Sequence, residues 1–203
     1  MTNDLFKKIK GQIEHSLQTT SGNSPFVVAI DGMSGSGKTT LGELLHQEFP
    51  DSNLLHIDDY FLQAHQRTPE RLAEVGGNVD YERFMEEIIL HLGDADGFYY
   101  HTYNCHTQTL SSEIHVTQKP LVIIEGAYSQ HHYFGNVYDL RIFCEISEEE
   151  QRKRIAKRNG LQMLERFVNE WIPKENLYFQ TYHIKEKSAF VYNTHVQQKS
   201  SLT

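Results

Sequence analysis

The segment that most constrains the fold of this chain is the glycine-rich stretch DGMSGSGKTT at residues 31–40. Before it, the run FVVAI at 26–30 is continuously apolar and rich in β-branched residues, which predicts a strand buried on both faces. After it, Leu41, Leu45 and Phe49 recur at helical spacing, and Pro50 ends the predicted helix. A buried strand, a glycine-rich turn and an amphipathic helix in this order indicate an α/β fold with a parallel sheet.

Within this stretch, Gly32, Gly37, Lys38 and Thr39 fit the pattern G-x-x-x-x-G-K-[ST]. Glycines let consecutive N–H groups turn toward an anion, and the following helix directs its positive dipole end to the same point. Lys38 is expected to reach the β- and γ-phosphates, and the Thr39 hydroxyl to bind Mg²⁺. The residues expected to hold the nucleotide are Gly32, Ser34, Gly35, Ser36, Gly37, Lys38, Thr39 and Thr40. The alternative is a glycine-rich turn with no ligand; the flanking strand and helix favour a site for a nucleoside triphosphate, with ATP and Mg²⁺ as the expected cofactors.

Strands and helices alternate along the rest of the chain. Further strands are predicted at residues 53–57, 120–126, 139–146 and 189–192. Helices are predicted at 2–18, around 84–92 and across 161–182 with an interruption at Pro173, and Ser147 with Glu150 marks the start of another. The aromatic segment 98–116 predicts a hairpin, and the polar segment 62–78 an irregular region. Residues 1–203 are therefore expected to form one doubly wound domain with a mostly parallel sheet of about five strands.

Composition excludes several classes of function. The formal net charge of −8 argues against binding to duplex nucleic acid, which requires a basic face. The two cysteines form no C-x-x-C motif and the twelve histidines show no zinc-type pairing, so free thiols in a reducing compartment are expected. We see no long apolar span and no signal-like start. These features predict a cytoplasmic protein without nucleic-acid or membrane partners, and they leave its oligomeric state open.

Acidic residues follow two of the predicted strands. Asp58 and Asp59 come directly after the second strand, and Glu125 ends the third. Because the carboxyl ends of parallel strands meet at one edge of a sheet, these carboxylates are expected beside the glycine-rich loop. A carboxylate there can accept the proton of an attacking hydroxyl, and Thr39, Asp58 and Glu125 are candidate Mg²⁺ ligands. Solvated turns are the alternative for each acid.

Five segments, GMSGSGKTT, HIDDYF, GNVDYERF, VIIEG and W-I-P-x-E-x-x-Y-F, occur here in the order seen in one family. Over roughly residues 25–192 the chain resembles the uridine kinase and phosphoribulokinase superfamily of P-loop kinases, and it is also similar to nicotinamide riboside kinases. The resemblance implies that Asp58 is the general base and that Asp59 orients the turn. It also implies that Asp80, with Tyr81 next to it, holds the acceptor.

The resemblance implies further that Arg154 and Arg158 belong to a helical lid around residues 148–165 that closes over the triphosphate. A solvated helix face is the alternative for both arginines. Uridine kinases read the pyrimidine with an aromatic segment that ends in histidine and arginine, whereas this chain carries YHTYNCHTQTL. Tyr103 could stack on a base and His106 or Gln108 could hydrogen-bond it, and a plain hairpin face is the alternative.

The expected activity is ATP- and Mg²⁺-dependent phosphorylation of a hydroxyl on a nucleoside-like small molecule. One alternative is a kinase for another small alcohol, such as a vitamin or a sugar acid. Another is a regulatory nucleotide-binding protein, although the chain has no Asn-Lys-x-Asp motif for guanine. Arg67 and Arg71 are the candidates to bind an anionic acceptor, and the alternative for both is pairing with Glu70 and Glu74.

Overall fold

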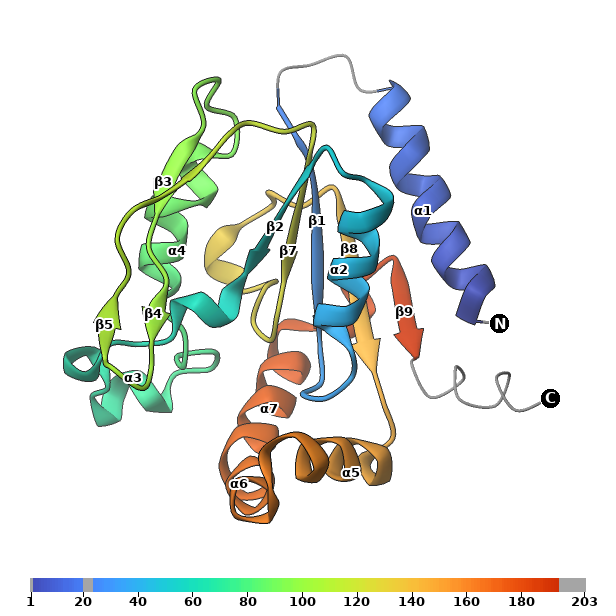
Figure 1. The fold of residues 1–203 in the computed structure, drawn as a ribbon. Helices are drawn as coiled ribbons and strands as arrows, with labels where there is room; N and C mark the ends of the chain where they lie inside the picture. The colour runs from blue at the N-terminus through green and yellow to red at the C-terminus, as the bar shows by residue number, and fades with distance from the viewer. Residues whose placement is uncertain (1, 20–23, 194–203) are drawn as a thin grey trace.

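The computed structural model describes residues 2–19 and 24–193 of the chain. At its centre, β1 (Phe26–Gly32) lies between β7 (Leu121–Glu125) and β8 (Leu140–Glu145), both parallel to it. β2 (Ser52–His56) and β9 (Phe190–Asn193) complete a parallel sheet of five strands in the order β2-β7-β1-β8-β9 (Figure 1). The predicted doubly wound α/β fold is confirmed.

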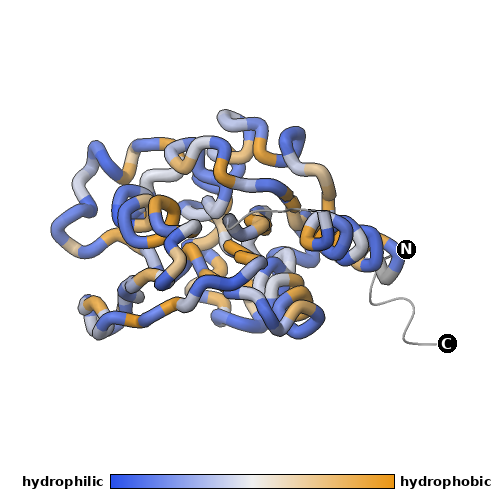
Figure 2. Tube along the Cα trace, turned by 90° about the horizontal axis from the view of Figure 1, so that it is seen from above, coloured by the Kyte–Doolittle hydropathy of each residue, from blue (hydrophilic) through white to orange (hydrophobic). Residues whose placement is uncertain are grey.

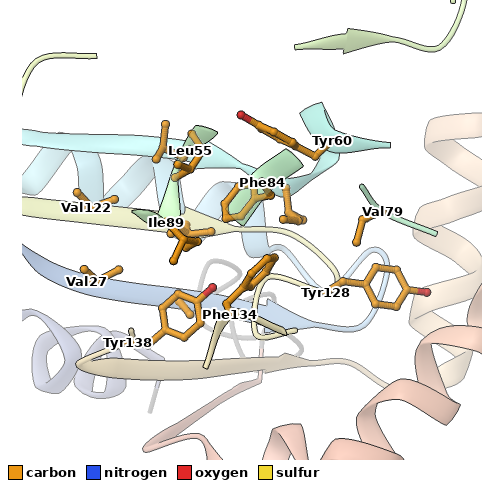
Figure 3. Close-up of a cluster of buried hydrophobic side chains, with 14 of the residues drawn as sticks. Val27, Leu55, Tyr60, Val79, Phe84, Ile89, Val122, Tyr128, Phe134 and Tyr138 are labelled. Atoms are coloured by element: carbon orange, nitrogen blue, oxygen red, sulfur yellow. The ribbon is translucent and has the colours of Figure 1, made fainter. Parts of the chain in front are cut away.

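The two faces of the sheet bury different clusters, because successive side chains of a strand point to opposite faces. Val28 and Ile30 of β1 pack with α1 (Thr2–Thr19) and α2 (Lys38–Glu48) on one face. Val27 and Ala29 pack on the other face with α4 (Tyr81–Glu87) and η4 (His132–Phe134), where the Phe84 and Phe134 rings lie 5.0 Å apart (Figure 3). In Figure 2, hydrophilic stretches predominate along the outer turns of the chain.

Between β2 and β7 the chain leaves the sheet, as predicted. Two antiparallel pairs build the hairpin: β3 (Phe98–Tyr100) with β6 (Ile114–Val116), and β4 (Tyr103–Asn104) with β5 (Thr109–Leu110). The segment predicted to be irregular contains the 3-10 turn η2 (Ala64–Gln66) and the short helix α3 (Pro69–Ala73). The helix predicted around 84–92 is shorter, since α4 ends at Glu87 and a 3-10 turn, η3 (Ile89–His91), follows.

The C-terminal third is mainly helical. It contains α5 (Glu148–Asn159), α6 (Leu161–Arg166), a π-helical turn η5 (Phe167–Trp171), α7 (Ile172–Tyr182) and α8 (Ile184–Lys187). The Ser147 hydroxyl accepts the N–H of Glu150 and caps α5 as predicted. Pro173 lies in the first turn of α7, directly after the π-helical turn η5, so the regular α-helix is interrupted next to Pro173, as predicted. None of the described helices is both long and apolar enough to cross a membrane.

Candidate active site

The loop between β1 and α2 has the curled backbone expected of a phosphate-binding loop. Gly32, Gly35 and Gly37 have φ angles of 139°, 76° and 94°. A Cβ atom at Gly32 would lie 2.1 Å from the carbonyl oxygen of Cys144, so the neighbouring strand requires glycine there. The Lys38 ammonium donates to the Gly32 carbonyl at 2.9 Å, which folds this side chain back over the loop. The predicted loop residues are therefore contiguous at the carboxyl end of β1.

A second group of polar side chains meets at Glu125, the last residue of β7. His56 ends β2 opposite Glu125 in the parallel register, and its Nδ1 lies 2.6 Å from Glu125 Oε1. The Thr39 hydroxyl donates to the two Glu125 oxygens at 3.2 and 3.3 Å. The hydrogen bond to Glu125 raises the pKa of His56. Thr39 and Glu125 are thus brought together, and His56 is a partner that the sequence analysis did not identify.

Asp58 lies in the 3-10 turn η1 (Ile57–Tyr60), immediately after β2. Gly126 has φ 131°, and a Cβ there would lie 2.4 Å from Ile57 and 3.4 Å from Asp58 Oδ1, so glycine allows η1 to approach the end of β7. Asp58 is open to solvent, and the protein atoms packed around this turn partly desolvate its carboxyl. This desolvation raises the pKa of Asp58 to about 6; Lys38 opposes the shift and Glu125 reinforces it.

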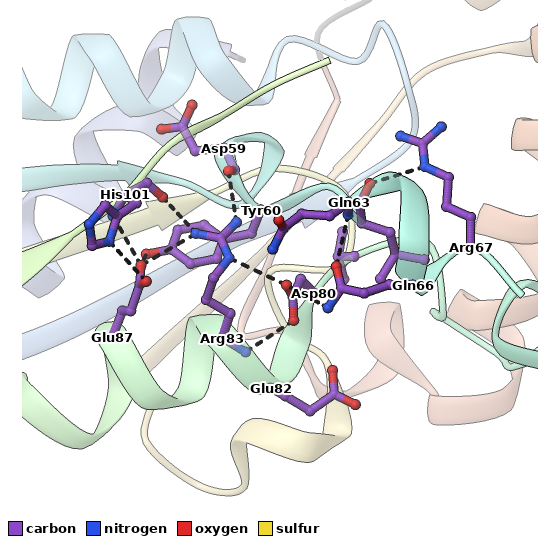
Figure 4. A network of polar contacts seen from close by, with 12 residues as sticks. Asp59, Tyr60, Gln63, Gln66, Arg67, Asp80, Glu82, Arg83, Glu87 and His101 are labelled. Atoms are coloured by element: carbon purple, nitrogen blue, oxygen red, sulfur yellow. Dashed lines mark hydrogen bonds and ion pairs between the residues drawn. The ribbon is translucent and has the colours of Figure 1, made fainter. Parts of the chain in front are cut away.

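The neighbouring Asp59 is held through its backbone. Its carbonyl accepts the Arg83 Nη2 at 3.3 Å, and Figure 4 shows its carboxylate directed away from the Arg83 network. Partial burial raises the pKa of Asp59, and the positive charges of His56 and Arg83 oppose this shift. Tyr60 is buried, with its ring under the Arg83 guanidinium at 3.9 Å and its hydroxyl donating to Glu87. Asp58 and Asp59 therefore lie on a turn, and Arg83 holds the backbone of that turn.

Asp80 is buried in a polar network that connects η1 with α4 (Figure 4). Its carboxylate caps α4 by accepting the Arg83 N–H at 3.2 Å and pairs with the Arg83 Nε at 3.3 Å. The Gln66 amide donates to the same carboxylate at 2.9 Å. An acceptor hydroxyl that bound Asp80 would have to share the carboxylate with these donors or replace one of them. Of the two side chains that donate, Arg83 is charged and Gln66 is uncharged. The role of Asp80 in holding an acceptor stays a prediction.

The other predicted acceptor residues lie in two places. The Tyr81 ring stacks on His131 at 4.5 Å and beneath Arg71 at 3.8 Å, so protein groups cover both of its faces. Tyr103 is buried on β4, a strand that contacts η1. His106 is exposed in the turn between β4 and β5, where its N–H bonds Asn104. The predicted roles of these residues toward an acceptor are not tested by this geometry.

Arg67 and Arg71, the two arginines between Asp58 and Asp80, have different partners. Arg71 forms ion pairs with Glu82 at 2.5 Å and Glu74 at 3.5 Å, so for Arg71 the alternative of an ion pair with Glu74 is correct. Arg67 is exposed, and its Nε donates to the Leu62 carbonyl at 3.0 Å. Among the residues that the structure describes, no acidic partner lies within ion-pair distance of Arg67. Arg67 is therefore the loop arginine that remains able to meet an anion.

The two predicted lid arginines, Arg154 and Arg158, differ in whether they contact the phosphate-binding loop. Arg154 donates to the Gly35 carbonyl of the phosphate-binding loop at 3.2 Å and pairs with Glu150 at 3.1 Å. Arg158 is exposed and donates to the side chain of Asn159 at 2.7 Å. Arg154 thus adjoins the loop, whereas Arg158 is not brought to it.

A buried carboxylate, Asp31, lies directly before the loop and was not singled out in the sequence. It accepts the N–H groups of Gly32 at 2.7 Å, Tyr128 at 3.2 Å and Gln130 at 3.0 Å, and the Tyr178 hydroxyl at 2.8 Å. Burial raises the pKa of Asp31 to about 6, although these hydrogen bonds favour the ionised form. The sequence alone did not reveal this role, because all of the partners of Asp31 except Gly32 are distant in sequence.

Asp31 predicts a pH dependence of stability in the ligand-free protein. Its pKa is about 6 when folded and near 3.8 when unfolded, so the folded state binds the proton more tightly. The stabilisation that this shift provides is complete below a pH of 3.8 and is lost as the pH rises through about 6. The free energy of unfolding therefore falls by at most about 3 kcal/mol over this range. Urea unfolding of wild type and Asp31→Asn at several pH values measures it. The variant should lack this decline; parallel pH profiles would contradict the assignment.

The donor set at this edge fits Mg²⁺. This ion takes oxygen ligands and is usually held by one or two carboxylates together with substrate phosphates and water. The Thr39 hydroxyl and the Glu125 carboxylate are such donors, and Asp58 adjoins them across Gly126. Within residues 2–19 and 24–193, no cluster of three or more His, Cys, Asp or Glu side chains could hold a metal ion by itself. A site completed by a nucleotide phosphate is consistent with both observations.

Several uridine kinases are similar in sequence to part of this chain. No family model matches the chain. A uridine kinase of Bacillus subtilis is 29% identical over 117 residues, 52% of this chain and 53% of that protein. A uridine kinase of Geobacillus sp. is 26% identical over 137 residues, 63% of this chain and 64% of that protein. The chain thus spans between about half and two thirds of the length of these relatives.

Solved structures share the fold. A Bacillus stearothermophilus protein provisionally assigned as a uridine kinase superposes with a TM-score of 0.66 at 19% identity, over 92% of this chain and 100% of that one. A Silicibacter sp. TM1040 protein provisionally assigned as a fructose transport system kinase gives 0.71 at 17%, over 93% and 98%. D-glycerate 3-kinase from Cryptococcus neoformans gives 0.61 at 14%, over 87% and 88%.

A parallel sheet in this strand order, with a phosphate-binding loop after β1, defines the P-loop kinase fold class. The sequence is also similar to those of uridine kinases, which agrees with the resemblance carried by the five motifs. The chain thus has the P-loop kinase fold and uridine kinases among its sequence relatives.

Proposed function

We propose that the protein transfers the γ-phosphoryl group of ATP, with Mg²⁺, to a hydroxyl of a nucleoside-like small molecule. The observation that carries this proposal is the meeting of the phosphate-binding loop, the Thr39–Glu125 pair and Asp58 at one edge of the sheet. A P-loop switch protein needs the first two features but has no use for a general base. The Asp58 carboxylate beside them favours phosphoryl transfer to an alcohol.

The protein's own residues would divide the reaction as follows. Lys38 and the loop N–H groups hold the phosphates, and Lys38 stabilises the charge that develops on the transferred group. Asp58 accepts the proton of the acceptor hydroxyl while that oxygen bonds to the γ-phosphorus, and ADP leaves. Mg²⁺ bound at Thr39 and Glu125 would supply neutralisation of phosphate charge. Arg154, which adjoins the loop, is the candidate to approach the triphosphate from α5.

The names of the sequence relatives support a nucleoside as the acceptor, and the structure of D-glycerate 3-kinase supports a small acid as the second candidate only through the shared fold. The charges around η1 favour the nucleoside over the small acid. Asp58 and Asp59 lie in η1 and Asp80 lies beside it, while Arg71 and Arg83 are already paired with acids. A phosphate or carboxylate would meet repulsion there unless Arg67 turned toward it.

We therefore expect an uncharged nucleoside to be phosphorylated more efficiently than its monophosphate or a carboxylate-bearing alcohol such as glycerate. Coupled ADP release with each acceptor measures kcat/KM, and Arg67→Ala should leave the nucleoside value nearly unchanged. Arg166→Ala, whose side chain is 55% exposed, is the matched control for loss of a surface arginine. A carboxylate acceptor preferred at least about tenfold, and losing that preference only in Arg67→Ala, would replace the nucleoside with an acid.

A further inference from the structure

Glu175 of α7 is a buried acid that contacts the phosphate-binding loop. Its residue is 5% exposed, and its Oε2 accepts the backbone N–H of Ser34 at 3.0 Å. Its Oε1 accepts the Ser34 hydroxyl in a short hydrogen bond. A carboxylate removed from water is costly unless donors satisfy it, and here a single loop residue supplies two of them.

The same helix makes a second contact one turn later. The Tyr178 hydroxyl donates to Asp31 at 2.8 Å, and residues three apart lie on one face of a helix. This face of α7 therefore holds the chain at Asp31, before the first glycine of the loop, and again at Ser34. The Tyr178 ring is fully buried and packs against Tyr128 with a centroid distance of 4.8 Å, so α7 has little freedom to shift.

Helix α5 also holds this part of the loop. The Gln151 amide donates to the Ser34 carbonyl at 2.9 Å, and Arg154 donates to the Gly35 carbonyl at 3.2 Å. All three polar groups of Ser34, its N–H, carbonyl and hydroxyl, are thus engaged by side chains more than a hundred residues away. None of these side chains belongs to the G-x-x-x-x-G-K-[ST] motif, whose lysine holds the Gly32 end of the loop.

We infer that Glu175 is a positioning residue for phosphoryl transfer, which fixes the outer half of the phosphate-binding loop through Ser34. This inference rests on the proposed kinase function. Preorganised donors stabilise a transition state without rearranging, and a small displacement of the loop would reduce turnover more than it reduces nucleotide binding. A negative charge beside a triphosphate repels it, so the charge of Glu175 does not favour nucleotide binding; its favourable contribution is the geometry of Ser34.

The test compares Glu175→Gln, Ser34→Ala and the double variant. Glutamine keeps the shape but offers one acceptor oxygen where glutamate offers two. We expect Glu175→Gln to lower kcat about 10- to 100-fold while the Kd for ADP, from calorimetry, changes less than about threefold. The double variant should lose less than the product of the two single losses, because both act on one contact. Glu170→Gln, on the preceding turn and 41% exposed, is the control and should behave as wild type.

Hydrogen exchange of the Ser34 and Gly35 amides provides a readout that needs no activity. We expect these amides to exchange at least about tenfold faster in Glu175→Gln than in wild type, while the α2 amides keep their protection. If the wild-type protein phosphorylates no acceptor, the proposed function fails. The inference is then tested by this amide exchange and by the rate of slow ATP hydrolysis in Glu175→Gln and wild type. Unchanged exchange, additive single losses, or parallel falls in kcat, ADP affinity and melting temperature would overturn it.

Discussion

Asp58→Asn is expected to reduce turnover by about a hundredfold to ten-thousandfold, because asparagine keeps the shape of the side chain but cannot accept the acceptor's proton. ATP should still bind, since the phosphate-binding loop and Lys38 are untouched. The measurement is acceptor-dependent ADP release, with ATP affinity determined separately by calorimetry.

Asp59→Asn is the matched control for this prediction. The Asp59 backbone is held by Arg83, and its carboxylate is directed away from that network, so the change should be milder (Figure 4). Both variants remove one negative charge from the same turn, so their common effect on charge cancels in the comparison. A larger loss in Asp59→Asn than in Asp58→Asn would show that the general base is the second aspartate of the pair.

Lys38→Ala is the second change expected to have a large effect, lowering turnover by at least about a hundredfold. The ammonium follows charge that develops on the transferred phosphoryl group, so its loss acts on the transition state more than on the folded protein. In the ligand-free protein the variant loses mainly hydrogen bonds to two loop carbonyls, at 2.9 and 3.1 Å. Such bonds contribute about 1 kcal/mol each, so the loss of both lowers the melting temperature by only about 4–8 °C.

Turnover and thermal unfolding of the same two preparations therefore separate chemistry from folding. An unchanged kcat in Lys38→Ala would exclude this loop as the site of phosphoryl transfer. A variant that fails to fold would be replaced by Lys38→Met, which keeps the aliphatic stem of the side chain but removes the charge.

The local pattern of the chain was sufficient to predict the parallel sheet and the phosphate-binding loop. Buried parallel strands read as continuous apolar runs, and β7 is buried along its whole length. The loop motif is contiguous, so its neighbours in sequence are also its neighbours in space. Asp58 and Glu125 were predictable beside it because parallel strands end at the same edge of a sheet. Each of these inferences needs only a period, a motif or a general rule of topology.

Tertiary structure alone decided which side chains hold that site. Glu175 contacts Ser34 and Tyr178 contacts Asp31 across more than a hundred residues, and no spacing in the sequence relates them, although Glu175 lies in one of the five motifs. A motif assigned Asp80 to the acceptor, and Arg71 was a candidate for binding an anionic acceptor, yet in the fold Asp80 pairs with Arg83 and Arg71 pairs with Glu82. A side chain's partners depend on which helices the core brings together, and the chemistry available at each residue follows from those partners.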